Sequence, residues 1–150
     1  MTTRSRRKRG TEGETAGGRA EGRDRRPGDL AGLRRALWAN AAFSGASGVA
    51  IAAGSSMLPE LLGAGTTTLY VLIGVFLIAF ALRLVLLARG EDIPRKEAVV
   101  IVASDWGWVV GSVLVIGMGF LTTLGAVLVG GTAVVVGGFA VWQGRNLPES

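Results

Sequence analysis

The sequence predicts an all-α membrane protein, a four-helix transmembrane bundle of two antiparallel hairpins that follows a disordered basic N-terminal tail. Three observations predict this class. Hydrophobic residues make up 49% of the 150 positions, and charged residues only 18%. Four apolar segments approach the roughly 20 residues that a helix needs to cross a bilayer. Of the 16 lysines and arginines, 11 lie within the first 35 residues, so the basicity belongs to a tail.

Residues 1–30 form the predicted tail. They are rich in Gly, Arg, Thr and Glu, and they bury too little apolar surface to offset the entropy of ordering. A basic run near its start suits an anionic lipid surface. Nucleic acid is less expected because no aromatic residue is interleaved for stacking. The favoured interpretation is a solvated cytoplasmic tail that helps to set topology. The basic run comprises Arg4, Arg6, Arg7, Lys8 and Arg9.

Residues 31–147 form the predicted bundle, with spans at about 36–54, 69–88, 98–118 and 121–142. Helices are expected because a backbone in lipid must satisfy its own hydrogen bonds. The third and fourth spans are rich in Val and Ile, which would suit strands in water. Their lengths favour helices instead.

The connection after the first span carries turn signals. Pro59 is expected to open a short interfacial turn that Gly63 closes, and Thr66 or Thr67 is expected to cap the second span. One alternative concerns the first span itself. Two arginines, a weak apolar stretch and the segment Ala50-Ile51-Ala52 resemble a cleavable signal peptide. The long charged region before that stretch favours a retained span.

The connection between the second and third spans is short. Gly90 is expected to end one helix and Pro94 to start the next, which predicts a tight antiparallel hairpin of these two spans. Four spans place this connection and both termini on one side, and the other two connections contain no Lys or Arg. The positive-inside rule then predicts a multi-pass membrane protein with both termini cytoplasmic. The juxtamembrane cations are Arg34, Arg35, Arg89, Arg95, Lys96 and Arg145.

The third span carries a carboxylate, Asp105, near its middle. A charge there costs roughly 2.5 to 3.5 kcal/mol on insertion scales, so it normally faces the bundle interior and has a partner. Arg83 lies about 9 Å from Arg89, and Asp105 lies about 13 Å from Lys96. The sequence therefore predicts an Arg83–Asp105 ion pair. The alternative is that Arg83 snorkels to the headgroups and Asp105 meets water or hydroxyl groups.

Other polar side chains are expected at a similar depth. Asn40 and Ser44 share a face of the first span, Trp108 and Ser112 share the face of Asp105 on the third, and Gln143 closes the fourth. They either line a small polar pocket or form hydrogen bonds that hold the helices together, each worth about 0.6 kcal/mol. We favour the second interpretation. The candidate intramembrane polar cluster comprises Asn40, Ser44, Arg83, Asp105, Trp108, Ser112 and Gln143.

Pairs of small residues four positions apart predict close helix contacts. This spacing does not distinguish contacts within one chain from contacts between chains. The pairs are Gly107 and Gly111 in the third span, Ser44 and Gly48 in the first, and Ala126 and Gly130 in the fourth.

The chain contains no cysteine and no histidine. This excludes disulfides, zinc sites with those ligands, and Cys–His or Ser–His catalysis. Asp105 is the only acid expected within the membrane. We therefore predict no catalytic residue, no cofactor and no metal site, and an enzyme is the least favoured class.

Three stretches carry a resemblance to known proteins: LWANAAFSGASG, the PELLG after the first span, and DWGWVVGS in the third. They resemble a group of small bacterial four-helix membrane proteins, and the layout is similar to the DoxX-like group of four-span proteins. The resemblance covers about residues 33–146. It implies a bacterial inner-membrane location and brings no catalytic residues.

Two function classes follow. The first is a structural or interaction helix bundle that partners another membrane protein or forms a homo-oligomer, as the small-residue faces suggest. The alternative is a small transporter or ligand-binding membrane protein that uses the Asp105/Arg83 pair. Small multidrug carriers usually place a glutamate in the first span, where this chain has Asn40. A paired arginine would also hold Asp105 ionised, so the first class is favoured.

Overall fold

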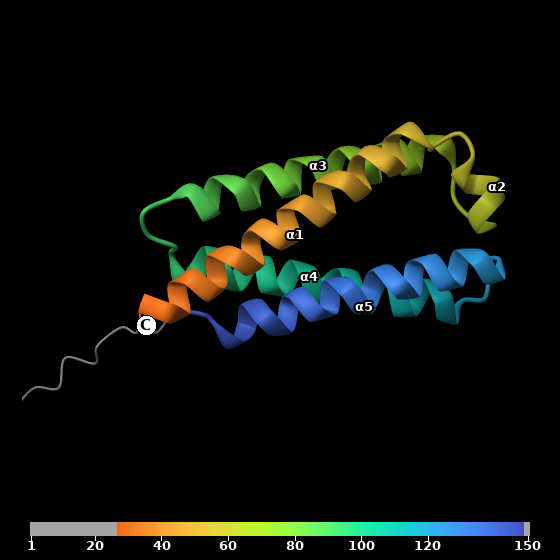
Figure 1. Cartoon of the computed structure of the whole chain (residues 1–150). Helices are drawn as coiled ribbons and strands as arrows, with labels where there is room; N and C mark the ends of the chain where they lie inside the picture. Colours follow the sequence, from red (N-terminus) through yellow and green to blue (C-terminus); the bar gives the residue numbers. More distant parts are fainter. Residues whose placement is uncertain (1–26, 149–150) are drawn as a thin grey trace, which may run out of the picture.

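The computed structural model describes residues 27–148, and every predicted span is a helix in it (Figure 1). Four helices are long and apolar enough to cross a membrane, and the residues described form no strand. The predicted all-α four-helix class is confirmed. The helices are α1 (Pro27–Ala53), α2 (Leu58–Leu62), α3 (Thr67–Arg89), α4 (Arg95–Gly117) and α5 (Thr123–Arg145).

The long helices pack as two antiparallel hairpins, α1 with α3 and α4 with α5. Figure 1 shows these pairs as two layers, with α2 at one end and the start of α1 and the end of α5 at the other. α1 also contacts α5, which joins the layers, whereas α3 and α4 do not pack closely along their length. The predicted tight hairpin of the second and third spans is therefore wrong, because their short connection crosses between the layers.

Two glycines allow α1 and α3 to pack closely against each other. A Cβ atom built on Gly48 would lie 2.8 Å from the carbonyl oxygen of Gly74, and one built on Gly74 would lie 2.7 Å from the oxygen of Gly48. Neither distance is compatible with a side chain. The backbones therefore approach as closely as small-residue pairs allow in membranes.

Helix α1 begins earlier than the predicted boundary of the tail. It starts at Pro27, a residue type that suits the first turn of a helix, so residues 27–30 belong to the helix. Leu33 and Leu37 lie four positions apart and are fully buried, which gives this first part of α1 a packed face. The predicted disordered tail at 1–26, with its basic run from Arg4 to Arg9, lies outside the described residues.

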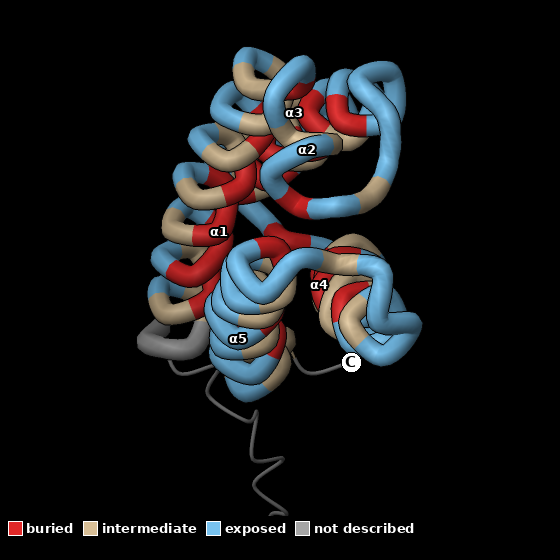
Figure 2. The backbone as a smooth tube through the Cα atoms, turned by 90° about the vertical axis from the view of Figure 1, so that its right-hand side faces the viewer, coloured by how far each residue is buried: buried red, intermediate tan, exposed pale blue. Residues whose placement is uncertain are grey.

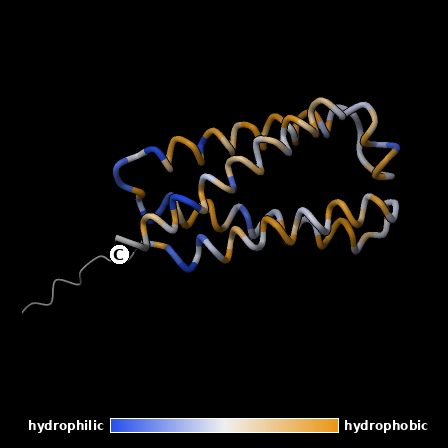
Figure 3. Tube along the Cα trace, viewed as in Figure 1, coloured by the Kyte–Doolittle hydropathy of each residue, from blue (hydrophilic) through white to orange (hydrophobic). Residues whose placement is uncertain are grey.

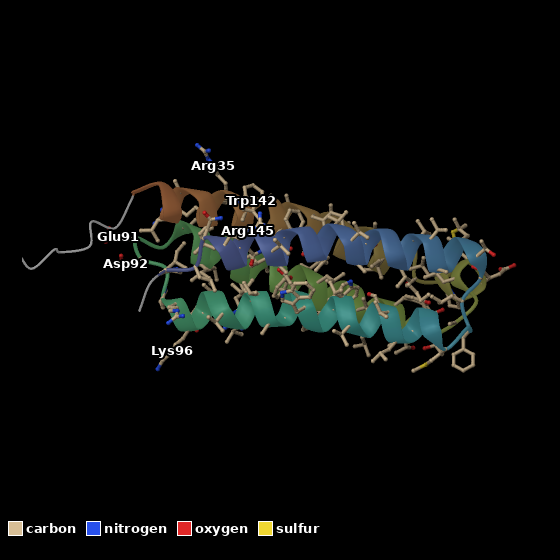
Figure 4. All side chains as sticks on the ribbon, turned by 90° about the horizontal axis from the view of Figure 1, so that it is seen from below. Arg35, Glu91, Asp92, Lys96, Trp142 and Arg145 are labelled. Atoms are coloured by element: carbon tan, nitrogen blue, oxygen red, sulfur yellow. The ribbon has the colours of Figure 1, made fainter. Side chains whose placement is uncertain are left out.

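The buried core is concentrated at the end of the bundle that holds the start of α1, the α3–α4 connection and the end of α5, which we call the charged end. Figure 4 shows Arg35, Lys96 and Arg145 at this end, and Figure 3 shows the strongly hydrophilic positions gathering there. In Figure 2 the buried positions face the interior, while exposed positions cover the outside. The core cluster at the charged end comprises Leu33, Leu37, Ala41, Leu84, Ala88, Ile93, Ala98 and Ile101.

The connections have the predicted start and stop signals. Pro59 lies in the first turn of α2, and Gly63 ends that helix in the left-handed region with φ of 79°. The Thr66 hydroxyl accepts a hydrogen bond from the Leu69 N–H at 3.2 Å and caps α3. Gly90 and Pro94 flank the α3–α4 connection as expected.

At the opposite end, α2 is bound to the start of α5 through one threonine. The Thr122 backbone N–H donates to the Leu62 carbonyl at 2.9 Å, and its hydroxyl donates to the Leu61 carbonyl at 2.7 Å. The same hydroxyl accepts from the Gly125 N–H and caps α5. Thr122 thus joins α2 to α5 at this end of the bundle.

Candidate functional site: a buried polar cluster

Four polar side chains from three helices meet inside the bundle and form the buried polar cluster: Asn40, Ser44, Asp105 and Gln143. Asp105 Oδ2 accepts a hydrogen bond from Asn40 Nδ2 at 2.7 Å and another from Gln143 Nε2 at 3.3 Å. Asp105 is 3% exposed, and both amide side chains are fully buried. The carboxylate therefore joins α1 of one hairpin to α4 and α5 of the other.

The orientation of the Asn40 amide is set within α1. Ser44 lies one turn further along the helix, and its hydroxyl donates to Asn40 Oδ1 at 3.1 Å. With the oxygen of the amide engaged on that side, the nitrogen is turned towards Asp105. A side chain that donates from a fixed position is a more effective partner for a buried carboxylate than a freely rotating one.

The helix directions explain how Gln143 reaches Asp105 from a different height. Side chains lean towards the N-terminus of their own helix. Gln143 lies near the end of α5 at the charged end, so its side chain leans into the bundle, whereas Asp105 on the antiparallel α4 leans back towards the charged end. The two side chains converge, and their hydrogen bond spans the α4–α5 contact.

The predicted Arg83–Asp105 ion pair is not formed. Arg83 Nη2 instead binds Glu97 Oε2 at 2.5 Å, with the two side chains 51% and 45% exposed. Because α3 and α4 lie in different layers, Asp105 faces α1 and α5 rather than α3. Arg83 follows the predicted alternative of snorkelling towards the end of the bundle, where Glu97 lies in the first turn of α4.

Two other residues of the predicted polar cluster, Trp108 and Ser112, lie on α4 near Asp105 but make no hydrogen bond to it. Trp108 is half-buried, and its Nε1 atom has no hydrogen-bond partner among the residues that the structure describes. Trp108 therefore makes no hydrogen bond to Asp105. Ser112 is buried one turn further along the same face. Of the seven predicted residues, the structure brings together four.

The charged end also contains contacts that the sequence analysis missed. Arg34 Nη2 donates to the carbonyl oxygens of Gly90 and Glu91, at 2.5 and 2.6 Å, and so binds α1 to the α3–α4 connection. The sequence placed Arg34 only among the topology signals. The available clue was that arginine commonly binds the free carbonyl groups at a helix C-terminus.

The cluster can act as a hydrogen-bonded joint between the two layers. Its amide nitrogens supply two donors to one carboxylate oxygen, and the arrangement contains no nucleophile of the types used in covalent catalysis other than that carboxylate and one serine. Within residues 27–148, no three His, Cys, Asp or Glu side chains gather as a metal site would require.

Comparisons with known proteins do not extend this description: no family model, curated protein or solved structure matches the chain. Its functional interpretation therefore depends on its own geometry.

Proposed function

We propose that this multi-pass membrane protein is a structural or interaction helix bundle, in which Asp105 joins the two hairpins rather than binding a transported substrate. The observation that carries this proposal is the engagement of Asp105. One oxygen of its nearly inaccessible carboxylate accepts hydrogen bonds from amides on two other helices. A carboxylate that is packed in this way supports helix association.

The positions of two cavities support the same interpretation. One cavity, lined by Phe76, Phe80 and Val100 among others, lies between α3 and α4. Another, lined by Phe43, Val127 and Val135 among others, lies between α1 and α5. Neither is lined by a residue of the buried polar cluster. A transport site built on Asp105 would need space for a substrate beside the carboxylate.

A transmembrane helix of a partner is the expected ligand of the bundle, and α4 is its expected contact. α4 has the smallest buried share of the four spans. A Cβ atom on Gly107 or Gly111 would meet nothing within 4 Å, unlike one on Gly48 or Gly74. The small-residue spacing that α1 uses inside the chain is thus left free on α4, which supports a contact with another membrane protein or a second copy.

The proposed location is a bacterial inner membrane, with both termini on the cytoplasmic side. The gathering of the juxtamembrane cations at the charged end, where Figure 4 labels Arg35, Lys96 and Arg145, supports this orientation. The chain has no cysteine, so single cysteines at Ser56 and Glu91 can be labelled without background. A membrane-impermeant maleimide added to intact cells should label Ser56→Cys and leave Glu91→Cys unlabelled. The reverse pattern would exclude the orientation.

The test of the structural role is the pair of variants Asp105→Asn and Asp105→Ala, with Ser104→Ala on the exposed side of α4 as control. The folded yield and the melting temperature in detergent should fall most for Asp105→Ala. They should fall less for Asp105→Asn, because asparagine still offers an oxygen to both amides. The control should change neither quantity appreciably. An Asp105→Asn protein that stays as stable as the parent but loses a proton-coupled flux or a bound ligand would support a transporter instead.

The test of the interaction is cysteine cross-linking in membranes. Gly107→Cys and Gly111→Cys should form cross-linked adducts, whereas Leu86→Cys, on an exposed position of α3, should not. Two differently tagged copies distinguish a homo-oligomer from a complex with another protein. Equal cross-linking at all three positions would indicate random collision and would remove the support for α4 as the contact.

A further inference from the structure

The layer boundary between α3 and α4 contains an apolar cavity that the buried polar cluster does not use. Its volume is about 280 Å³, and it is lined by Phe76, Ala79, Phe80 and Arg83 of α3 and by Val100, Ile101 and Ser104 of α4. We call it the α3–α4 groove. Phe76 and Val100 are 60% and 46% exposed, so the groove is accessible from the outside of the bundle, where acyl chains lie. It arises because α3 and α4 are consecutive along the chain but belong to different layers.

The groove has a charged mouth. The Arg83 guanidinium is half exposed and bound to Glu97, and a guanidinium carries five N–H donors in a planar fork that matches phosphate. Lys96 lies one turn before Val100 and therefore on the groove side of α4. Figure 4 shows Lys96 projecting from the side of α4, while Glu91 and Asp92 lie at the tip of the bundle. Arg83 and Lys96 are positive and Glu97 is negative, so the mouth of the groove carries one net positive charge.

The depth of the groove matches one leaflet. Ser104 lies nine residues into α4, about 14 Å from its start, and Phe76 lies thirteen residues before the end of α3, about 20 Å away. Half of the hydrocarbon thickness is about 15 Å. The groove thus runs from the level of the headgroups to the middle of the membrane, with charge at one end and apolar side chains along the rest.

We propose that the α3–α4 groove binds a glycerophospholipid of the leaflet at the charged end. Its phosphodiester binds Arg83 and Lys96, and one acyl chain lies along Phe76, Phe80 and Val100. A transmembrane helix does not suit the groove, because the Arg83–Glu97 ion pair bridges α3 and α4 at the charged end and blocks a segment that must continue across the membrane. A lipid ends at that level. The net positive charge of the mouth favours an anionic headgroup over a zwitterionic one.

The test measures lipid binding to the purified full-length chain in detergent by native mass spectrometry. Phosphatidylglycerol and phosphatidylcholine with identical acyl chains are titrated separately. We expect tighter binding of phosphatidylglycerol, and we expect Arg83→Gln to weaken it about fivefold, as the loss of one cation near the membrane surface would. Arg145→Gln, which removes a cation at the same end but outside the groove, should leave the affinity unchanged.

A second pair of variants tests the acyl chain independently of charge. Ala79→Phe fills the groove and should abolish lipid binding, whereas Val134→Phe, at an exposed position of α5, should not. Glycerol phosphate, which has the headgroup chemistry without chains, should not compete at concentrations equal to the lipid. Unchanged binding in Arg83→Gln or Ala79→Phe, equal binding of the two lipids, or full competition by glycerol phosphate would each overturn the proposal. Gly107 and Gly111 continue the face of Val100 and Ser104 in the half of α4 away from the charged end. A partner helix that cross-links at these glycines must therefore cross α4 at an angle and leave the groove open.

Discussion

The two hairpins use their glycines differently, although the helices of the second hairpin contain more of them, nine against five. In the α1–α3 hairpin, Gly48 and Gly74 face each other so closely that neither position has room for a Cβ atom. In the α4–α5 hairpin, Cβ atoms at Gly130 and Gly137 would meet side chains of α4 at the ordinary distances of 3.7 and 3.6 Å. The first hairpin is therefore held by backbone approach and the second by side-chain packing.

This difference shows that a small-residue motif predicts the capacity for a close contact, not its location. Gly107 and Gly111 form the most obvious GxxxG of the chain, yet nothing described in the structure lies within 4 Å of a Cβ atom at either position. Gly74 belongs to no such pair that the sequence analysis identified, and it makes one of the closest contacts. Which glycine is used depends on the neighbour and on the rotation of each helix.

The largest expected effect comes from breaking the closer hairpin. Gly74→Val places side-chain atoms where the Gly48 carbonyl oxygen and Ala52 lie, so α1 and α3 must separate. We expect a loss of about 3 kcal/mol in the free energy of unfolding, measured by SDS titration in mixed micelles. Gly107→Val is the matched control and should change stability by less than about 0.5 kcal/mol. Equal losses would show that the hairpins do not differ in this way.

The second-largest loss of stability is expected from breaking the hydrogen bonds of Asp105, which join the two hairpins. Asn40→Leu removes the shorter hydrogen bond to Asp105 and leaves the Ser44 hydroxyl without its acceptor, and we expect a loss of about 2 kcal/mol. Gln143→Leu removes only the longer bond, so we expect about 1 kcal/mol. The same SDS titration gives both values. A larger loss for Gln143→Leu would contradict the assignment of Asn40 as the principal partner.

The third prediction compares the threonine caps of α3 and α5, whose removal should have smaller effects on stability. Thr66 caps α3 with one hydrogen bond, whereas Thr122 caps α5 and also binds the Leu61 carbonyl of α2. Thr66→Val should cost about 1 kcal/mol, and Thr122→Val should cost more because it also frees α2. Thermal unfolding in detergent, followed by circular dichroism, measures both variants. Indistinguishable melting temperatures would show that the α2 contact adds nothing to stability.

The smallest effect is expected at the ion pair between the hairpins. Arg83 and Glu97 are each about half exposed, and pairs of this kind contribute about 0 to 1 kcal/mol. A double-mutant cycle of Arg83→Gln and Glu97→Gln should give a small coupling energy that falls with salt. The cycle of Arg83→Gln with Asp105→Asn should be additive within about 0.5 kcal/mol. A larger coupling energy in the second cycle would show that Arg83 and Asp105 interact after all.

Much of the candidate site could be anticipated from residue type and depth. Asn40, Ser44, Asp105 and Gln143 were expected in one polar cluster because polar groups in membrane helices turn inward. Their pairing was not anticipated. The prediction that Arg83 pairs with Asp105 assumes that consecutive helices pack together, and the incorrect hairpin of the second and third spans rests on the same assumption.

The amino-acid sequence by itself determined the number of spans, the helix ends at Gly63 and Gly90, a threonine cap at Thr66 or Thr67, and the end of the bundle at which the cations gather. These properties depend on local composition, on backbone geometry at single residues and on the hydrophobic thickness of a bilayer. Only the tertiary structure decided that Asp105 binds Asn40 and Gln143, that Arg83 binds Glu97, and that Gly48 meets Gly74. Those choices depend on which helices become neighbours and how each is rotated, and apolar surfaces of similar composition leave several such arrangements close in energy.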